Sequence, residues 1–283
     1  MAEQIDLTGK VAVVTGAGSG IGRATARLLA RRGATLHIAD VHADTVAAVA
    51  YEISGAGGDA TAHTLDVSRP DDVEAFAGAV FAADGRVDIL HNNAGVGHAG
   101  DIEATTVEDW QRVIGVNLLG VAYGIQAFVP RMLAQGRPAV IVNTASMAGL
   151  FPTAKMAPYC ASKFGVVGMS ETLDAELRSR GIRVVAVCPG VIDTGIVRAT
   201  TMRGELAADR DKLVALYANR GTSPDVVAAA VLDGIVRPRP IIVSPRWQVL
   251  GPYLLHRLSP RLTQPLASGL TKLANLVPAK TRP

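Results

Sequence analysis

The chain has 283 residues, of which 49% are hydrophobic and 4% aromatic, so it can bury a large aliphatic core as one α/β domain or two smaller ones. Its 28 basic and 25 acidic residues nearly balance, and no basic stretch is interleaved with aromatic residues, which argues against nucleic-acid binding. Two cysteines, Cys160 and Cys188, supply no disulfide framework, and no run of about 18 uncharged apolar residues predicts a membrane-spanning helix, so we expect a cytoplasmic location.

The first predicted unit is a strand, a glycine turn and a helix. β-branched residues dominate the strand at 11–15, glycines occupy alternate positions from Gly16 to Gly22, and the stretch 23–32 is rich in Ala, Arg and Leu. A glycine turn lets the backbone approach a pyrophosphate, and the N–H groups of the following helix bind it. The arrangement favours dinucleotide binding over a purely structural turn, although the spacing differs from the G-x-G-x-x-G pattern.

An acidic residue follows the second predicted strand, at 35–39. Asp40 lies about 20 residues beyond the turn, where a carboxylate accepts hydrogen bonds from an adenosine ribose and repels a 2′-phosphate. The alternative is a helix cap or a solvated loop carboxylate. No Lys or Arg directly follows Asp40, and Ser19 stands where a basic residue could hold a phosphate, so the pattern favours NAD over NADP.

Strands and helices alternate along the rest of the chain, which predicts a parallel sheet covered by helices on both faces. Further strands are expected at 61–65, 87–91, 139–143 and 182–188, and helices at 44–54, 71–83, 107–133 and 161–180. Asp66 follows one strand and could contact an adenine amino group or cap the next helix, and the two roles are compatible. Asn117 is an amide inside an apolar helical stretch, so it needs a partner or a purpose.

Tyr159 and Lys163 are four residues apart at the start of a helix, so their side chains share one face. A tyrosine with a pKa of about 10 is a poor base at neutral pH, but a neighbouring ammonium stabilises the phenolate and lowers that pKa. Tyr159 can then donate a proton to a carbonyl or accept one from an alcohol, and Ser146 can hydrogen-bond the same oxygen. Such a pair also occurs on many surface helices, and its meaning here depends on the glycine turn.

Six motifs occur along the chain: Thr15-Gly16-x-x-x-Gly20-x-Gly22, Asn92-Asn93-Ala94-Gly95, Asn117, Ser146, Tyr159-x-x-x-Lys163 and Pro189-Gly190-x-x-x-Thr194. In this order and spacing they resemble the classical short-chain dehydrogenase/reductase family, over about residues 5 to 245. The resemblance implies one Rossmann-type domain, a three-layer, doubly wound α/β fold with a parallel sheet of about seven strands. It also implies, by analogy, a homotetramer or a homodimer.

The resemblance further implies a role for each motif. Tyr159 would be the acid/base, and Lys163 would lower its pKa and bind the nicotinamide ribose. Ser146 would orient the substrate oxygen, and Asn117 would hold a water for proton relay. The implied cofactor contacts are Gly16, Ser19, Gly20, Ile21, Gly22, Asp40, Asp66, Val67, Asn93, Ala94, Gly95, Pro189, Gly190, Ile192 and Thr194, together with Tyr159 and Lys163. No metal is expected.

Substrate residues are expected on loops beyond the carboxyl ends of the strands. The candidate loops are 96–98, 147–152 and 195–220, and the predicted contacts are Ser146, Met147, Phe151 and Tyr159. The first two loops are mainly apolar, so we expect a hydrophobic alcohol or ketone. His98 and Lys155 could meet a polar group or simply be solvated, and 195–220 is predicted to be a mobile helical lid.

Residues 246–283 form a basic extension beyond the predicted domain of residues 5–245. No Asp or Glu follows Asp233, and apolar residues recur at steps of three or four from Leu258 to Val277, interrupted by two prolines. Two interpretations compete for this amphipathic helix. It packs on the body or on a neighbouring subunit, or it lies on an anionic membrane surface as a peripheral contact.

The sequence thus predicts an NAD-dependent oxidoreductase that moves a hydride between the cofactor and a hydrophobic secondary alcohol or ketone. One alternative is an NADPH-dependent ketoreductase, such as a 3-oxoacyl reductase. Another is a non-catalytic regulatory or scaffold protein that binds a dinucleotide on the same fold. The presence of Ser146, Tyr159 and Lys163 together argues against the last, because a non-catalytic module has no need of all three.

Overall fold

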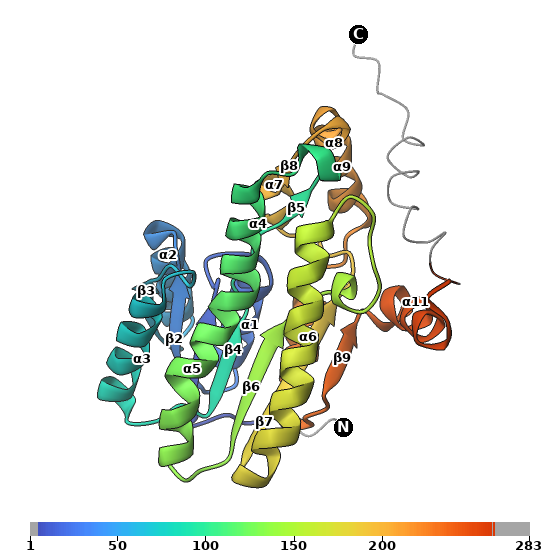
Figure 1. Ribbon diagram of the computed structural model, residues 1–283. Coiled ribbons are helices and arrows are strands. Elements are labelled where there is room, and N and C mark those ends of the chain that lie inside the picture. The colour runs from blue at the N-terminus through green and yellow to red at the C-terminus, as the bar shows by residue number, and fades with distance from the viewer. Residues whose placement is uncertain (1–4, 262, 264–283) are drawn as a thin grey trace.

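The computed structural model describes residues 5–261 and 263, and its centre is one sheet of seven parallel strands. The strands are β1 (Val11–Thr15), β2 (Thr35–Asp40), β3 (Asp59–Thr64), β4 (Ile89–Asn92), β6 (Ala139–Thr144), β7 (Ile182–Pro189) and β9 (Ile241–Ser244). In space they follow the order β3-β2-β1-β4-β6-β7-β9 (Figure 1). The strand order therefore reverses between β1 and β4, and α/β proteins bind ligands in the crevice at the carboxyl ends of such strands.

Helices cover both faces of the sheet, as the alternation of strands and helices predicts (Figure 1). One face is covered by α1 (Gly20–Ala30), α2 (Ala43–Gly55) and α10 (Pro224–Val236). The other is covered by α3 (Pro70–Asp84), α5 (Gly120–Ala134) and α6 (Ala157–Leu177). The three-layer, doubly wound parallel domain implied by the resemblance is therefore confirmed.

The core is aliphatic because the central strands are buried on both faces. All five residues of β1 are buried, without the alternation of a half-exposed strand. β4 also buries His91 completely, and its Nε2 lies 2.9 Å from the Thr144 hydroxyl oxygen. Burial lowers the pKa of this imidazole to about 3, so it is neutral at physiological pH.

Most predicted elements are present with boundaries shifted by a few residues, and two shifts matter for the site. α1 begins at Gly20 rather than at residue 23, because the glycine turn itself supplies the first residues of the helix. α6 begins at Ala157 rather than at residue 161, with Pro158 in its first turn, where the missing N–H of a proline is not needed. The first turn of α6 consequently contains Tyr159.

The helix predicted at 107–133 is composite. It consists of α4 (Val107–Ile114), a π-helical turn (Gly115–Leu119) and α5. The whole stretch, Val107–Ala134, is long and apolar enough to cross a membrane by length and composition, although no membrane-spanning helix was expected from the sequence. Here it packs over the sheet against α3 and α6, which is the place of a sheet-covering helix in an α/β domain.

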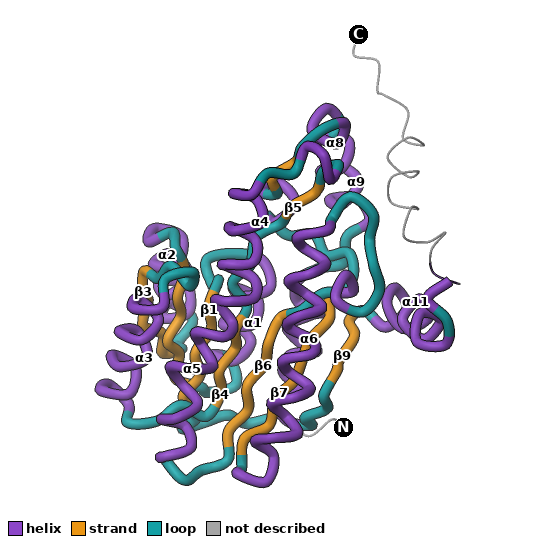
Figure 2. Tube along the Cα trace, in the orientation of Figure 1, coloured by secondary structure: helices purple, strands orange, loops and turns teal. Residues whose placement is uncertain are grey.

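A group of short elements lies beyond the carboxyl ends of the strands (Figure 2). It includes a parallel two-stranded sheet of β5 (His98–Ala99) and β8 (Thr201–Met202), and the helices α7 (Ile196–Ala199), α8 (Glu205–Ala208) and α9 (Arg210–Arg220). 3-10 turns are also found here at Ile102–Ala104 and at Met147–Gly149. A further 3-10 turn, Arg178–Arg180, lies at the opposite end of the sheet, between α6 and the start of β7. The predicted lid, 195–220, therefore stands above the end of the sheet where the crevice opens.

The last described helix is α11 (Arg246–Leu258), which lies at the β9 edge of the sheet (Figure 1). Its Val249 is completely buried in the core cluster that also contains Ala145 and Cys188. The start of the extension is thus packed on the domain. Most of the amphipathic helix predicted from Leu258 to Val277 lies outside the described residues.

Candidate active site

A cavity of about 670 Å³ opens at the carboxyl ends of the central strands. Its wall contains most of the predicted site residues: Gly16, Ser19, Gly20, Ile21, Asp40, Asp66, Val67, Asn93, Ala94, Gly95, Ser146, Met147, Tyr159, Lys163, Pro189, Gly190, Ile192 and Thr194. The fold therefore brings residues from both halves of the sheet to one hollow. Three predicted site residues, Gly22, Asn117 and Phe151, are not part of this wall.

Two of the predicted glycines are required by close contacts of the backbone. Gly16 has a φ of +64°, and a Cβ there would lie 2.7 Å from Ala94 Cα. A Cβ at Gly22 would lie 2.2 Å from the Gly16 carbonyl oxygen. Gly22 thus packs α1 against the turn and does not line the cavity, and its predicted contact with the cofactor stays a prediction.

The wall formed by the glycine turn suits a phosphate. Gly20 and Ile21, at the N-terminus of α1, line the cavity, and the first turn of α1 contains no acidic side chain. N–H groups at a helix N-terminus attract anions, and an acidic side chain beside them would weaken that attraction. The turn and α1 therefore fit the pyrophosphate of a dinucleotide.

Asn93 holds the end of β4 against the end of β1. Its backbone N–H donates to the Thr15 hydroxyl (3.0 Å), and its side-chain Nδ2 donates to the carbonyl oxygens of Thr15 (2.9 Å) and Gly16 (3.2 Å). Its Oδ1 accepts a hydrogen bond from the Thr144 hydroxyl at 3.2 Å. These bonds join the ends of β1, β4 and β6 at the crevice.

Two carboxylates on the wall are fixed by backbone N–H groups. Asp40 accepts hydrogen bonds from the N–H of Gly18 (3.0 Å) and of His42 (3.1 Å), so it is held beside the glycine turn. Asp66 accepts from the N–H (2.9 Å) and the hydroxyl (2.7 Å) of Ser68, in the turn that leads into α3. Neither residue is the N-cap of the following helix, and both face the cavity.

Lys163 is buried, with 3% of its surface exposed. Its Nζ donates to the Thr144 carbonyl oxygen at 2.8 Å and lies 5.8 Å from the ring centre of Tyr159. Burial disfavours the charged form and lowers the pKa of the ammonium to about 8, so the side chain stays mainly protonated at neutral pH. The predicted juxtaposition of phenol and ammonium is present.

Ser146 follows β6 and begins the 3-10 turn Met147–Gly149. Its Oγ accepts a hydrogen bond from the Ala148 N–H at 3.1 Å, and its hydroxyl can donate to a substrate oxygen. A Cβ at Gly149 would lie 2.5 Å from the Lys163 carbonyl oxygen, so this turn packs directly on α6. Ser146 is thereby held in the same cavity as Tyr159.

Asn117 lies in the π-helical turn and is completely buried. Its Oδ1 accepts from the Val96 N–H (2.8 Å), and its Nδ2 donates to the Val96 carbonyl (3.0 Å) and approaches the Ser162 hydroxyl (3.3 Å). The amide thus has the partner that the sequence required, and it holds the loop after β4 against α6. A role in holding a water for proton relay stays a prediction.

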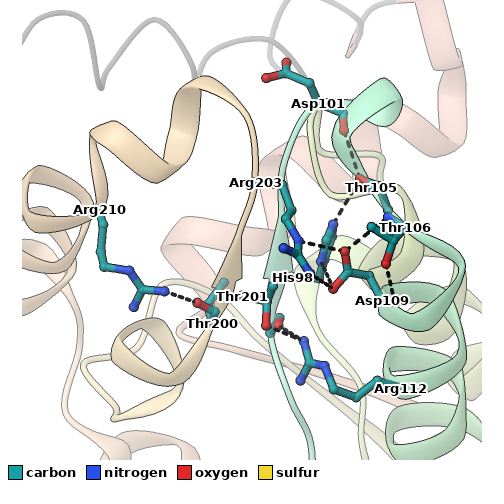
Figure 3. A network of polar contacts seen from close by, with 11 residues as sticks. His98, Asp101, Thr105, Thr106, Asp109, Arg112, Thr200, Thr201, Arg203 and Arg210 are labelled. Atoms are coloured by element: carbon teal, nitrogen blue, oxygen red, sulfur yellow. Dashed lines mark hydrogen bonds and ion pairs between the residues drawn. The ribbon is translucent and has the colours of Figure 1, made fainter.

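The part of the lid around β8 is tied to α4 (Figure 3). Arg203, just after β8, binds the Asp109 carboxylate through Nε (2.9 Å) and through a terminal nitrogen (3.2 Å). Arg112 donates to the Thr201 hydroxyl at 2.9 Å. The bond from Arg203 lowers the pKa of Asp109 to about 2, so the pair is ionised at neutral pH.

The two polar residues considered for substrate contact have other partners. Lys155 forms ion pairs with Asp101 (2.8 Å) and with Glu205 at the start of α8 (3.1 Å). His98 is completely buried, and its Nε2 lies 3.1 Å from the Thr105 hydroxyl. Neither lines the cavity. Lys155, through Glu205, and Arg203 both attach the middle of the lid to the domain. Mobility of the lid stays a prediction.

The lid end of the cavity is apolar, with a wall that includes Met147, Met156, Val197, Met202, Leu206 and Leu213. Phe151, predicted as a substrate contact, is not on this wall. It is buried in a core cluster that also contains Leu150 and Val166. Within the described residues, no three His, Cys, Asp or Glu side chains gather as a metal site.

Several supports of the site have no local sequence pattern that predicts them. The Thr15 hydroxyl accepts a hydrogen bond from the Asn93 N–H. Thr144 donates to Asn93 through its hydroxyl and accepts from Lys163 at its carbonyl oxygen. Gln248 reaches from α11 to the N–H of Val191, beside the predicted cofactor loop. Each of these contacts joins residues at least 19 positions apart, so only the fold brings them together.

Comparisons with known proteins point to one family. A family model described as short chain dehydrogenase matches residues 10–204, more than half of the chain. The probable oxidoreductase EphD of Mycobacterium tuberculosis is 41% identical over 262 residues, which are 90% of this chain and 43% of that protein. The chain therefore spans less than half the length of this relative.

Solved structures agree with the family match. A short chain dehydrogenase/reductase from Burkholderia phymatum in complex with NAD is 36% identical, with a TM-score of 0.84, covering 92% of this chain and 96% of that one. A metagenomic short-chain oxidoreductase in complex with NADP is 35% identical, with a TM-score of 0.70, covering 84% and 97%. The neighbours thus include complexes with either nicotinamide dinucleotide.

The buried ammonium makes stability depend on pH. The pKa of Lys163 is about 8 in the folded protein and about 10.4 in an unfolded chain, so between these values the unfolded state binds the proton that the folded state has lost. The free energy of unfolding should therefore rise across this window, by roughly 3 kcal/mol relative to a Lys163→Met variant. Urea unfolding from about pH 7 to about pH 10 measures the difference, with Tyr159→Phe in both proteins as background. Parallel pH profiles would contradict a depressed pKa.

Proposed function

Because the chain belongs to the short-chain dehydrogenase/reductase family, we propose that it transfers a hydride between NAD(H) and a hydrophobic secondary alcohol or ketone. The observation that carries this proposal is that Tyr159, Lys163 and Ser146 line one cavity together with the glycine turn. A binding scaffold has no use for a phenol, an ammonium and a hydroxyl in that wall. The non-catalytic alternative is accordingly disfavoured.

The wall offers groups for the pyrophosphate and for both riboses of a dinucleotide. The glycine turn and the N-terminus of α1 would hold the pyrophosphate, Asp40 the adenosine ribose and Lys163 the nicotinamide ribose. When bound, the nicotinamide supplies or accepts the hydride.

Proton transfer falls to the chain's own side chains. In the direction of reduction, Tyr159 donates its phenolic proton to the carbonyl oxygen, and in the direction of oxidation the phenolate takes the proton of the alcohol. The Lys163 ammonium stabilises the phenolate, and the Ser146 hydroxyl donates to the same substrate oxygen. Since the pKa of Lys163 is about 8, this stabilisation weakens as the pH rises above that value.

We assign NAD rather than NADP on the position of Asp40. Its carboxylate is fixed beside the glycine turn and faces the cavity, where it would repel a 2′-phosphate. An NADPH-dependent ketoreductase of the 3-oxoacyl reductase kind is the competing assignment. It would require the phosphate to approach this carboxylate.

An apolar substrate is supported by the lid end of the cavity. Met156, Met202 and Leu206 lie on its wall, while the nearby charges of Lys155 and Arg203 are engaged in ion pairs. Burying apolar substrate surface against such side chains contributes about 25 cal/mol per Å². The same wall also contains Arg112, Thr153 and Thr200, so a substrate of this kind would meet a few polar groups among mainly apolar ones.

Tyr159→Phe removes only the phenolic hydroxyl and should abolish the proton transfer. We expect turnover of a hydrophobic secondary alcohol to fall by at least about 100-fold, with NADH binding within about twofold of the parent. Initial rates of NADH formation and the fluorescence of bound NADH measure the two quantities. Tyr123→Phe, on α5 and away from the cavity, is the matched control. Turnover that survives in the Tyr159 variant would refute the acid/base assignment.

Asp40→Ala removes the carboxylate that opposes a 2′-phosphate. The ratio of kcat/KM for NAD to that for NADP should fall by about tenfold or more, because the like-charge repulsion is lost. Asp44→Ala, with the same charge change on the exposed first turn of α2, should leave the ratio unchanged. A parent protein that uses NADP better than NAD would contradict the assignment.

We also propose a homodimer or homotetramer in a reducing, cytoplasmic setting. Leu119 and Phe164, each 40% exposed, lie on the adjacent π-helical turn and α6, where a second copy could cover them. Cys160 and Cys188 are buried and unpaired, which suits a compartment that keeps thiols reduced.

For the C-terminal extension we propose peripheral contact with an anionic membrane through α11. Three large apolar side chains of this helix are well exposed: Trp247 (77%), Leu254 (52%) and Leu258 (80%). Arg246 and Arg257 flank them, and no acidic residue follows Asp233. An apolar stripe with cations beside it suits a surface of acidic lipids.

Flotation with vesicles tests this contact. The full chain should float with vesicles rich in phosphatidylserine but not with phosphatidylcholine vesicles, because the arginines require acidic lipid. Trp247→Ser/Leu258→Ser should stay at the bottom of the gradient, while the matched surface change Tyr51→Ser on α2 should not affect flotation. No flotation of the parent, or equal flotation of the double variant, would exclude α11 as the contact. Dimerisation lost in the double variant would assign the stripe to a second copy instead.

A further inference from the structure

The two ends of the lid lie side by side at the rim of the cavity. Before the lid, Val191 accepts a hydrogen bond at its carbonyl from the N–H of Thr222 (3.0 Å). After the lid, Thr222 accepts at its carbonyl from the N–H of Asp193 (3.0 Å), and Ile192 and Thr222 form a parallel bridge. The segment 195–220 is therefore closed at its base by strand-like bonds.

Gln248, in the first turn of α11, contacts both ends of this base. Its Oε1 accepts from the Val191 N–H at 2.7 Å, and its Nε2 donates to the Thr222 hydroxyl at 3.3 Å. One side chain from the extension thus bonds to the segment that enters the lid and to the segment that leaves it. The Val191 bond is the shorter of the two.

The position of Gln248 depends on its surroundings. A Cβ at Gly190 would lie 2.2 Å from Gln248 Oε1 and 3.2 Å from Val249 Cγ2, so a larger residue here would displace the Gln248 amide from its present position. The Gly190 N–H donates to the Ser244 carbonyl at the end of β9 (2.8 Å), and Val249 is completely buried. The first turn of α11 is therefore fixed to the core on both sides of Gln248.

The loop that Gln248 holds is part of the cavity wall. Pro189, Gly190, Ile192 and Thr194 line the cavity, and a Cβ at Gly20 would lie 3.2 Å from Thr194 Cβ. The loop thus packs directly against the glycine turn at Thr194 and Gly20. A displacement of Val191 would move this wall, whereas Tyr159, Lys163 and Ser146 stand on other elements and would stay in place.

We propose that Gln248 is a positioning residue for cofactor binding, which holds the loop 190–194 at the cavity wall and fixes the hinge of the lid. The inference rests on the proposed function, because it takes the cavity to be the dinucleotide site. It makes the extension a part of the active site's framework, although Gln248 itself does not line the cavity.

Substitutions at Gln248 separate positioning from folding. Gln248→Leu removes both hydrogen bonds at similar size, and Gln248→Glu keeps the acceptor for Val191. We expect the leucine variant to raise the KM for NAD and the Kd for NADH by about fivefold to tenfold, the effect of losing one or two net hydrogen bonds, with kcat changed less than twofold. The glutamate variant should recover most of the loss. Gln111→Leu, the same change at an exposed position on α4, is the matched control.

Two further measurements complete the test. Hydrogen exchange of the peptide that contains Val191 should speed up in the leucine variant, while its melting temperature stays near that of the parent. Thr222→Val removes only the hydroxyl bond and should shift KM in the same direction by less. In the double variant the two effects should not add, since both substitutions break the same bond.

The outcomes distinguish this inference from the proposed function. A parent protein that binds no NADH overturns the proposed function and the inference with it. A parent that binds NADH, together with a leucine variant whose KM, Kd and Val191 exchange equal those of the parent, overturns the inference alone. If Gln248→Leu fails to fold, an unchanged KM for NAD together with unchanged hydrogen exchange at Val191 in Thr222→Val overturns it as well.

Discussion

The hydrogen bond from the Lys163 ammonium to the Thr144 carbonyl is the interaction that connects the fold to its chemistry. A buried charge is costly unless it is hydrogen-bonded, so α6 must keep Lys163 at the end of β6. That constraint places Tyr159, one turn earlier on α6, opposite Ser146, which follows Thr144 in the chain after one residue. The relative position of phenol, ammonium and hydroxyl is therefore set by the packing of one helix on one strand.

The same strand end also belongs to the cofactor half of the crevice. The Thr144 hydroxyl donates to Asn93, and Asn93 in turn holds the carbonyl oxygens of Thr15 and Gly16. Thr144 thus contacts Lys163, for which we propose a role in proton transfer, through its carbonyl oxygen. Through its hydroxyl it contacts Asn93, which holds the glycine turn. The two halves of the sheet meet at this residue, so the part of the cavity proposed to bind the cofactor and the part proposed for catalysis share one support.

Features set by local spacing are predicted well from the sequence. The glycine turn and the pairing of Tyr159 with Lys163 each lie within about one or two helical turns, where spacing alone determines which groups can meet. Features set by long-range packing are not. An apolar Phe151 on a loop is compatible with a substrate contact or with the core, and only its packing with Leu150 and Val166 in the folded chain identifies it as core. Asn117 needed a partner, but only the approach of the loop after β4 identifies it as Val96. The distant contact of Gln248 has no pattern in the sequence at all.

The adjacency of the lid's two ends has a consequence for how such an enzyme diversifies. Because Ile192 and Thr222 are neighbours, the intervening segment is an excursion that departs from and returns to nearly the same point. Its length and composition can change while the sheet and the dinucleotide crevice keep their coordinates, since lengthening a closed excursion costs entropy that grows only with the logarithm of its length. Under the proposed function, in which this segment covers the substrate, substrate range could change without altering the cofactor site.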